Sequence, residues 1–219
     1  MALASGLGLR ESSRQLGLSL RCLELKARKL SRHLRQLNVR LAPRLGTRRR
    51  LVFDELETYE GRRNTRPLTV PIVVDAESRF LLWAESAPIR PSGTMTKSRK
   101  AAIAADEARL GPRRDLSGRA CTRTLGRVAK LVPEDLLVDF DTDEKSTYPG
   151  LIRRAFGRRL ASHRKTKSIL PRGTWNPLFP VNHEEARARD LMGRLRRESW
   201  LVSKKRRYLD LALQLHLAY

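Results

Sequence analysis

Hydrophobic residues recur at two different spacings along the chain, and the spacing changes near residue 51. Residues 9–17 and 19–38 carry apolar side chains at helical intervals and predict two helices. The leucines of the second segment share one helical face: Leu23, Leu30, Leu34 and Leu37. The runs RLVFDELETYE, LTVPIVVDAESR and FLLWAESAPI then predict three strands, whose short connections favour antiparallel pairing. The pattern therefore predicts a helical segment followed by a sheet.

Helical and extended patterns alternate in the rest of the chain. Residues 98–110 and 119–131 predict two helices, and DLLVDFD predicts a fourth strand. The remaining segments are a helix over 148–160, a basic loop with prolines over 161–180, and a helix over 183–199 followed by a last one to the end. This order is typical of an α/β fold in which helices pack on a mixed sheet.

A glycine turn joins the two N-terminal helices. Gly17 suits the position that follows a helix C-terminus, and Ser19 can cap the next helix. A short helix, a tight turn and a long basic helix form the pattern of a helix-turn-helix, whose second helix would enter a DNA major groove. An ordinary αα-hairpin explains the same spacing. The expected DNA contacts on this helix are Arg21, Lys26, Arg28 and Lys29.

The predicted organisation has three parts. Residues 1–38 form the helix-turn-helix segment, residues 39–50 a basic linker, and residues 51–219 the sheet domain with basic C-terminal helices. In the last part we expect side chains that contact backbone phosphates without reading sequence. These are Arg196, Arg197, Lys204 and Lys205.

The net charge of +23 is unevenly distributed. Residues 1–50 carry a net +11, residues 51–150 carry 16 basic and 16 acidic side chains, and residues 151–219 carry a net +12. Basic flanks favour a polyanion as partner, and a neutral middle disfavours an RNA-binding structural protein. The acids of the middle are clustered, either as solvated turns or as ligands that hold divalent cations against a phosphate. The two clusters are Asp54, Glu55, Glu57 and Glu60, and Asp139, Asp141, Asp143 and Glu144.

The cysteine content and hydropathy predict a cytoplasmic protein. Cys22 and Cys121 are too few for a disulfide framework or a zinc ribbon. No run of 18 apolar residues is long enough to cross a membrane, and the first residues lack a secretory signal.

Two aspartates of the neutral middle stand where a metal-dependent site would need them. Asp54 lies on the first predicted strand and Asp143 directly follows the fourth, 89 residues later. This is the arrangement of a ribonuclease-H-like mixed sheet flanked by helices, in which these two strands are neighbours. Two such carboxylates and a third ligand can hold two Mg²⁺ ions for phosphoryl transfer.

Three sequence segments together resemble one protein family. FDELETY, TDEKSTYPG and the tail RLRRESWLVSKKRRYLDLALQLHLAY are similar to the DDE transposases of bacterial insertion sequences, most closely the insertion-sequence-one type. The resemblance covers roughly residues 50–219. It implies strand cleavage and strand transfer with Mg²⁺ or Mn²⁺ at element ends, and double-stranded DNA as both end and target. It also implies a homo-oligomer on DNA and a place at the bacterial nucleoid.

The third ligand has two candidates. The family carries a catalytic Glu about seven residues before an Arg, and with Arg189 as that Arg the position is Asn182. Asn182 also suits a helix N-cap, with Glu185 completing a capping box. Glu184 lies at helical spacing with Ala188, on the stripe expected to face the sheet. The expected metal ligands are therefore Asp54, Asp143 and Glu184, with Asn182 as the alternative.

The chain also departs from that family. Relatives commonly carry a zinc ribbon of paired Cys-x-x-Cys motifs before the helices, and this sequence has no such pairs. An abbreviated copy is therefore one expectation. The alternative to an active enzyme is an inactive transposase remnant, or a DNA-binding regulator that uses the N-terminal helices.

Overall fold

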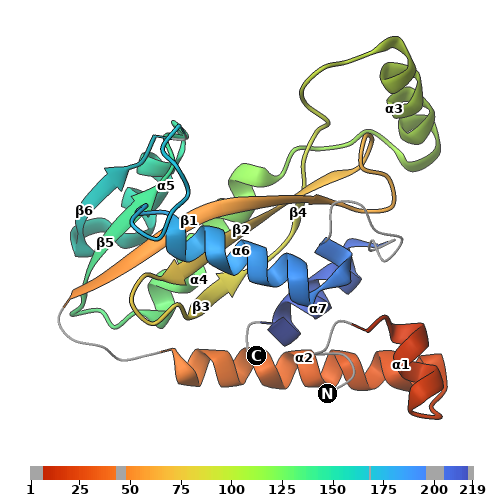
Figure 1. Cartoon of the computed structure of the whole chain (residues 1–219), viewed down its shortest axis with the longest axis horizontal. Helices are drawn as coiled ribbons and strands as arrows, with labels where there is room; N and C mark the ends of the chain where they lie inside the picture. Colours follow the sequence, from red (N-terminus) through yellow and green to blue (C-terminus); the bar gives the residue numbers. More distant parts are fainter. Residues whose placement is uncertain (1–6, 43–47, 168, 196–204, 217–219) are drawn as a thin grey trace.

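The computed structural model describes residues 7–42, 48–167, 169–195 and 205–216. Its centre is a mixed, open sheet with helices on both faces, as Figure 1 shows. The strand order is β3-β2-β1-β5-β6, and β4 pairs with β2. The strands are β1 (Arg48–Tyr59), β2 (Pro67–Asp75), β3 (Leu81–Ala84), β4 (Ala87–Pro88), β5 (Leu137–Thr142) and β6 (Leu160–Lys165). The α/β class predicted from the sequence is confirmed.

The strand directions divide the sheet into two parts. β1 pairs antiparallel with β2, and β2 pairs antiparallel with β3 and β4, which confirms the predicted meander. β5 pairs parallel with both β1 and β6. β1 is therefore the strand at which the antiparallel and parallel parts meet.

Alternate side chains of β1 enter two hydrophobic cores. Val52 and Leu56 pack on one face with α6 (Phe179–Leu191) and α7 (Arg206–His216). Leu51 and Phe53 pack on the other face with α4 (Ser117–Leu131) and α5 (Tyr148–Phe156). This is the two-residue period of a strand that is covered on both sides. Even-numbered positions of β1 thus face α6, and odd-numbered positions face α4 and α5.

Three shorter or more peripheral elements complete the sheet domain. α3 (Lys97–Leu110) projects away from the sheet at the top right of Figure 1. Two short 3₁₀ turns cover Gly157–Arg159 and Gly193–Leu195. The first turn follows α5, which ends at Phe156 because Gly157 takes a positive φ of 52°.

The N-terminal helices are α1 (Leu9–Gln15) and α2 (Leu20–Leu41). The predicted turn is confirmed: Gly17 has a φ of 61°, and the Ser19 side chain accepts a hydrogen bond from the backbone N–H of Cys22 at 3.2 Å. α2 runs beside α7 along the lower edge of Figure 1. Its Ser31 hydroxyl donates to the carbonyl of Leu211 at 3.2 Å. The helix pair is therefore docked against the sheet domain.

The buried face of α2 differs from the predicted leucine stripe. Leu30 is 44% exposed and Leu37 is 41% exposed. The buried positions are Leu23, Ala27, Ser31 and Asn38. Apart from Leu23, small and polar residues occupy this face, because the helix packs closely on α7 and binds its neighbours through hydrogen bonds. Asn38, for example, donates to the Leu82 carbonyl at 3.0 Å.

Three predicted boundaries were wrong. α2 continues to Leu41 and β1 begins at Arg48, which leaves little of the basic linker predicted over 39–50; residues 43–47 lie outside the described part. The predicted loop over 161–180 contains most of β6, an edge strand with largely exposed side chains. α6 begins at Phe179 with Leu178 as its N-cap, so Asn182 lies inside the helix and the predicted capping box with Glu185 does not form.

Candidate functional site

Asp54 and Asp143 stand at the same level of two neighbouring parallel strands. The register of β1 and β5 pairs Val52 with Asp141, an offset of 89 residues. Asp54 and Asp143 share that offset, and Asp143 directly follows the last residue of β5. Residues at matching positions of parallel strands point to the same face. Asp54 therefore faces α6, and Asp143 lies just beyond the paired part of β5, close enough for its charge to act on Asp54.

The carboxylate of Asp54 is half-buried beside other negative charges. Its Oδ1 accepts one hydrogen bond, from the backbone N–H of Glu55 at 2.7 Å. Burial, followed by the charges of Asp143 and Glu55, raises the pKa of Asp54 to about 6, against the opposing effects of that hydrogen bond and of Arg172. Asp54 thus lies in a region where negative charge is incompletely balanced.

Glu185 is the third carboxylate of this region. It lies on α6, is 8% exposed, and its pKa is raised to about 7 by burial and by the charge of Asp54. Arg189, one turn further along α6, approaches its Oε2 at 3.4 Å and opposes the shift together with Arg172. The Glu185 Oε1 atom is buried and has no hydrogen-bond partner. A carboxylate oxygen in this state is available to a ligand.

Glu185 was not among the predicted site residues, because its position suited a capping box with Asn182. Val181, Glu185, Ala188 and Met192 follow one another at steps of four, three and four, and all are buried. This spacing is the same signal that was used for Glu184. The two neighbouring glutamates both lie on the buried side of α6, and periodicity alone does not separate them.

Glu184 is engaged elsewhere in the structure. It is 1% exposed, and its Oε1 lies 2.7 Å from Nε2 of His216 on α7. Arg187 lies near its second oxygen, at 3.7 Å. Glu184 therefore joins α6 to α7. Asn182, the other predicted third ligand, is half-buried in the first turns of α6.

Several other acids of the two sequence clusters have partners. Asp141 binds Arg50 at 2.5 Å and Arg164 at 2.7 Å. Glu55 points to the opposite face of the sheet, where Lys145, Thr69 and Tyr148 donate hydrogen bonds to it. Burial alone would raise the pKa of Glu55, but these hydrogen bonds lower it below its usual value. Acids that are neighbours in the sequence thus differ in the structure. Cationic partners balance the negative charge of Glu55 and Asp141, whereas the negative charge of Asp54 is incompletely balanced.

The uncompensated carboxylates carry the oxygen donors that a divalent metal ion prefers. No three His, Cys, Asp or Glu side chains within the described ranges are close enough together to form a complete metal site. Mg²⁺, however, commonly binds through one or two carboxylates plus substrate phosphates, without an all-protein cage. Asp54 with Asp143 or Glu185 supplies suitable oxygen donors, and the unpaired Glu185 oxygen is one of them. The donor set therefore fits Mg²⁺ or Mn²⁺ that is shared with a phosphate.

The predicted DNA-contacting residues fall into three groups. Arg21, Lys26 and Lys29 are exposed on α2, and Lys205 is exposed just before α7. Arg28 is half-buried and lines a pocket between α2 and α7. The remaining predicted contacts lie outside the described residues: Arg196, Arg197 and Lys204.

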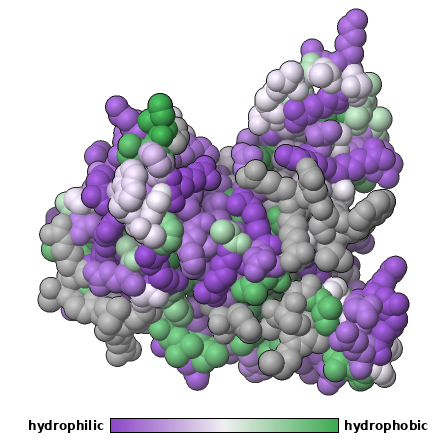
Figure 2. All heavy atoms as spheres, viewed as in Figure 1, coloured by the Kyte–Doolittle hydropathy of each residue, from purple (hydrophilic) through white to green (hydrophobic). Residues whose placement is uncertain are grey.

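The exterior of the molecule is largely polar. Hydrophilic residues cover most of the face drawn in Figure 2, with smaller apolar patches between them. Across the described segments, no helix combines the length and apolar character needed to cross a membrane. Comparisons with known protein families and with curated proteins found no match to this chain.

Proposed function

We propose that the chain is a metal-dependent DNA transposase of the DDE type, which cleaves strands at the ends of an insertion sequence and transfers them to target DNA. The observation that carries the proposal is the placement of Asp54. It lies on β1 near Asp143, which directly follows the neighbouring parallel strand β5, and its charge also acts on Glu185 of α6. The pKa values of Asp54 and Glu185 are both raised, and such perturbed carboxylates are typical of functional sites.

Carboxylates would hold the metal ions together with the substrate phosphate, because no three of them form a complete metal site by themselves within the described ranges. Asp54 and Asp143 keep the roles that the sequence predicts, and Glu185 replaces Glu184 and Asn182 as third ligand. When bound, Mg²⁺ or Mn²⁺ would activate the attacking oxygen and stabilise the leaving oxygen of the phosphodiester. Arg172 is exposed on the loop before α6 and acts on both Asp54 and Glu185, so it would bind a non-bridging phosphate oxygen.

The basic flanks would hold the DNA. The exposed cations of α2, including Lys26 and Lys29, support the proposed helix-turn-helix as an end-recognition element. The sequence resemblance of residues 50–219 to transposases of the insertion-sequence-one type supports an assembly of several copies on two ends, in the bacterial cytoplasm at the nucleoid. A ribonuclease-H-like fold would also place β1 and β5 side by side, as they lie in this sheet.

Substitution of the two aspartates tests the proposal. The substrate is a duplex that carries the DNA flanking the gene, incubated with a target plasmid and Mg²⁺ or Mn²⁺. Asp54→Asn and Asp143→Asn should each reduce cleavage and strand transfer by more than about a hundredfold. Losing a group that only orients a metal ligand lowers activity by up to about a hundredfold, and losing a direct ligand should cost more. DNA affinity, measured by anisotropy without metal, should change little.

A DNA-binding protein without catalysis is the second candidate. The absence of a preassembled three-residue metal site within the described ranges favours it. It predicts strongly salt-dependent DNA binding that is indifferent to Mg²⁺. Cleavage by Asp54→Asn at the wild-type rate would reject the assigned site, and DNA binding without metal-dependent cleavage by the wild-type chain would favour this second candidate.

A further inference from the structure

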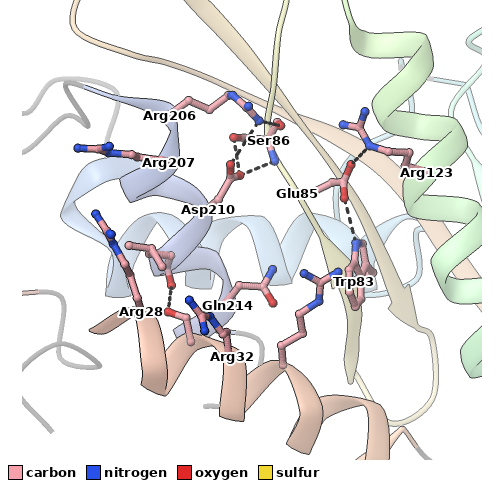
Figure 3. A pocket seen from close by; sticks show the side chains of 13 residues that line it. Arg28, Arg32, Trp83, Glu85, Ser86, Arg123, Arg206, Arg207, Asp210 and Gln214 are labelled. Carbon is pink, nitrogen blue, oxygen red and sulfur yellow. Dashed lines mark hydrogen bonds and ion pairs between the residues drawn. The ribbon is translucent and has the colours of Figure 1, made fainter. Parts of the chain in front are cut away.

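A pocket of about 450 Å³ lies between α2 and α7, away from the carboxylates of β1 and α6. Its walls also include Trp83 at the end of β3, Glu85 and Ser86 beyond it, and Arg123 of α4. Figure 3 shows Arg28 and Arg32 rising from α2 toward α7 and toward Gln214. The volume is within the range of small-ligand sites.

Arginine dominates this pocket. Six guanidinium groups line it against two carboxylates, Glu85 and Asp210. The six are Arg28, Arg32, Arg35, Arg123, Arg206 and Arg207. This gives a net charge of +4 in a concave space between packed elements, where a positive potential is concentrated.

Both carboxylates already have partners. Glu85 binds Arg123 at 2.6 Å. Asp210 accepts hydrogen bonds from the backbone N–H and the hydroxyl of Ser86, at 2.9 and 2.6 Å, and lies 3.3 Å from Arg206. These contacts balance Arg123 and Arg206 and leave the other four arginines without a carboxylate in the pocket.

The four remaining guanidinium groups differ in how they are held. Arg35 stacks on Trp83 at 4.3 Å from the ring centroid, and Arg207 stacks on Tyr208 at 4.9 Å. Arg28 and Arg32 have no ion pair or hydrogen bond to any residue in the described part of the chain. Burial lowers the pKa of Arg35, and the nearby charge of Arg127 lowers it further. An anion would relieve this crowding of positive charge.

We propose that this pocket binds a short run of phosphate groups, supplied either by a nucleic-acid strand or by a free polyphosphate. Arginine suits this ligand because its planar fork binds phosphate oxygens in pairs. The two unpaired forks, Arg28 and Arg32, are one helical turn apart on the same face of α2, and Arg207 approaches from α7. The site uses no carboxylate of β1 or α6 and needs no metal.

Calorimetric titration of the full chain with sodium tripolyphosphate, in EDTA, tests the proposal independently of strand cleavage. The wild type should bind one tripolyphosphate, and R28A/R32A should bind it at least about tenfold more weakly because two charge-assisted contacts are lost. Arg207→Ala should weaken binding from the opposite wall and is a second route to the same result. The matched control is K97A/K100A, which removes two positive charges from exposed positions of α3 outside the pocket.

A labelled single-stranded DNA of ten nucleotides distinguishes the two sources of phosphate. Displacement of the DNA by tripolyphosphate, with the same loss in R28A/R32A, assigns the pocket to a nucleic-acid strand. Tripolyphosphate binding without such competition assigns it to a free polyphosphate. Equal losses in R28A/R32A and K97A/K100A, or the absence of saturable binding in the wild type, would overturn the proposal. Because no metal is present, these outcomes do not depend on whether the chain cleaves DNA.

Discussion

The two faces of the sheet treat neighbouring carboxylates of β1 in opposite ways. On the α4 and α5 face, Glu55 receives hydrogen bonds from Lys145, Thr69 and Tyr148, and its pKa is lowered. On the α6 face, Asp54 receives one backbone hydrogen bond and lies near further negative charge, so its pKa is raised to about 6. One acid stabilises the fold and the next destabilises it. An acidic cluster in a sequence therefore has no single role.

The same division recurs on α6. Glu184 is paired with His216 of α7. Glu185 has a buried oxygen without a hydrogen-bond partner, and the charge of Asp54 raises its pKa. Burying a carboxylate without full compensation costs stability, and such costs are typically retained where a site needs the charge. Glu55 and Glu184 therefore stabilise the structure, whereas Asp54 and Glu185 are available to a ligand.

The largest expected effect concerns the two glutamates. Under the proposed function, Glu185→Gln should lower metal-dependent strand cleavage by more than about a hundredfold, because it removes a charged ligand. Glu184→Gln keeps the buried contact with His216 in neutral form and should cleave within about threefold of wild type, since it binds neither metal nor substrate. The measurement is single-turnover cleavage at equal protein concentration.

The melting temperatures of both variants serve as the control for folding. Glu185→Gln should melt no lower than wild type, because it removes a repelled charge. A loss of cleavage in Glu184→Gln with normal folding, together with full activity in Glu185→Gln, would return the third position to Glu184, as the sequence alone suggested.

The next effect concerns stability at the neighbouring positions of β1. Glu55→Ala leaves Lys145, Thr69 and Tyr148 without their shared acceptor and should lower the free energy of unfolding by about 3 kcal/mol. Asp54→Asn should leave it unchanged or raise it at pH 8, because the amide carries no charge. Urea denaturation at pH 8 measures both. Equal destabilisation by the two substitutions would contradict the difference between the faces.

Much of the framework could be predicted from sequence because its signals are local. The apolar runs of β1, β2 and β5 and the glycine turn at Gly17 follow from short-range physics, and the strand pairing of β1 with β5 places Asp54 and Asp143 at one level. β6 was missed because an exposed edge strand has too few apolar residues to distinguish it from a basic loop.

The third carboxylate could not be chosen from sequence for a different reason. Glu184 and Glu185 both lie on the buried side of α6, and the contact of Glu184 with His216 of α7 distinguishes them. That contact joins residues 32 positions apart and depends on how two helices pack. The N-cap preference of Asn placed the predicted helix start at Asn182. The helix begins earlier, at Phe179, because Pro180 is well tolerated in a first helical turn.

The smallest expected effect is the dependence of stability on pH. The raised pKa values, about 6 for Asp54 and about 7 for Glu185, mean that the folded state holds these protons more tightly than the unfolded state does. Well below pH 4 both states are protonated and the repulsion costs nothing; well above pH 7 the folded state bears it fully. The free energy of unfolding should therefore fall by about 2 kcal/mol between pH 4.5 and 8, after allowance for the solvent that screens Asp54.

D54N/E185Q should lack this fall, while the opposite contribution of Glu55, which is lost as pH decreases, should persist in both proteins. If the two proteins give parallel curves in urea denaturation across this range, Asp54 and Glu185 do not form the uncompensated pair that distinguishes the α6 face.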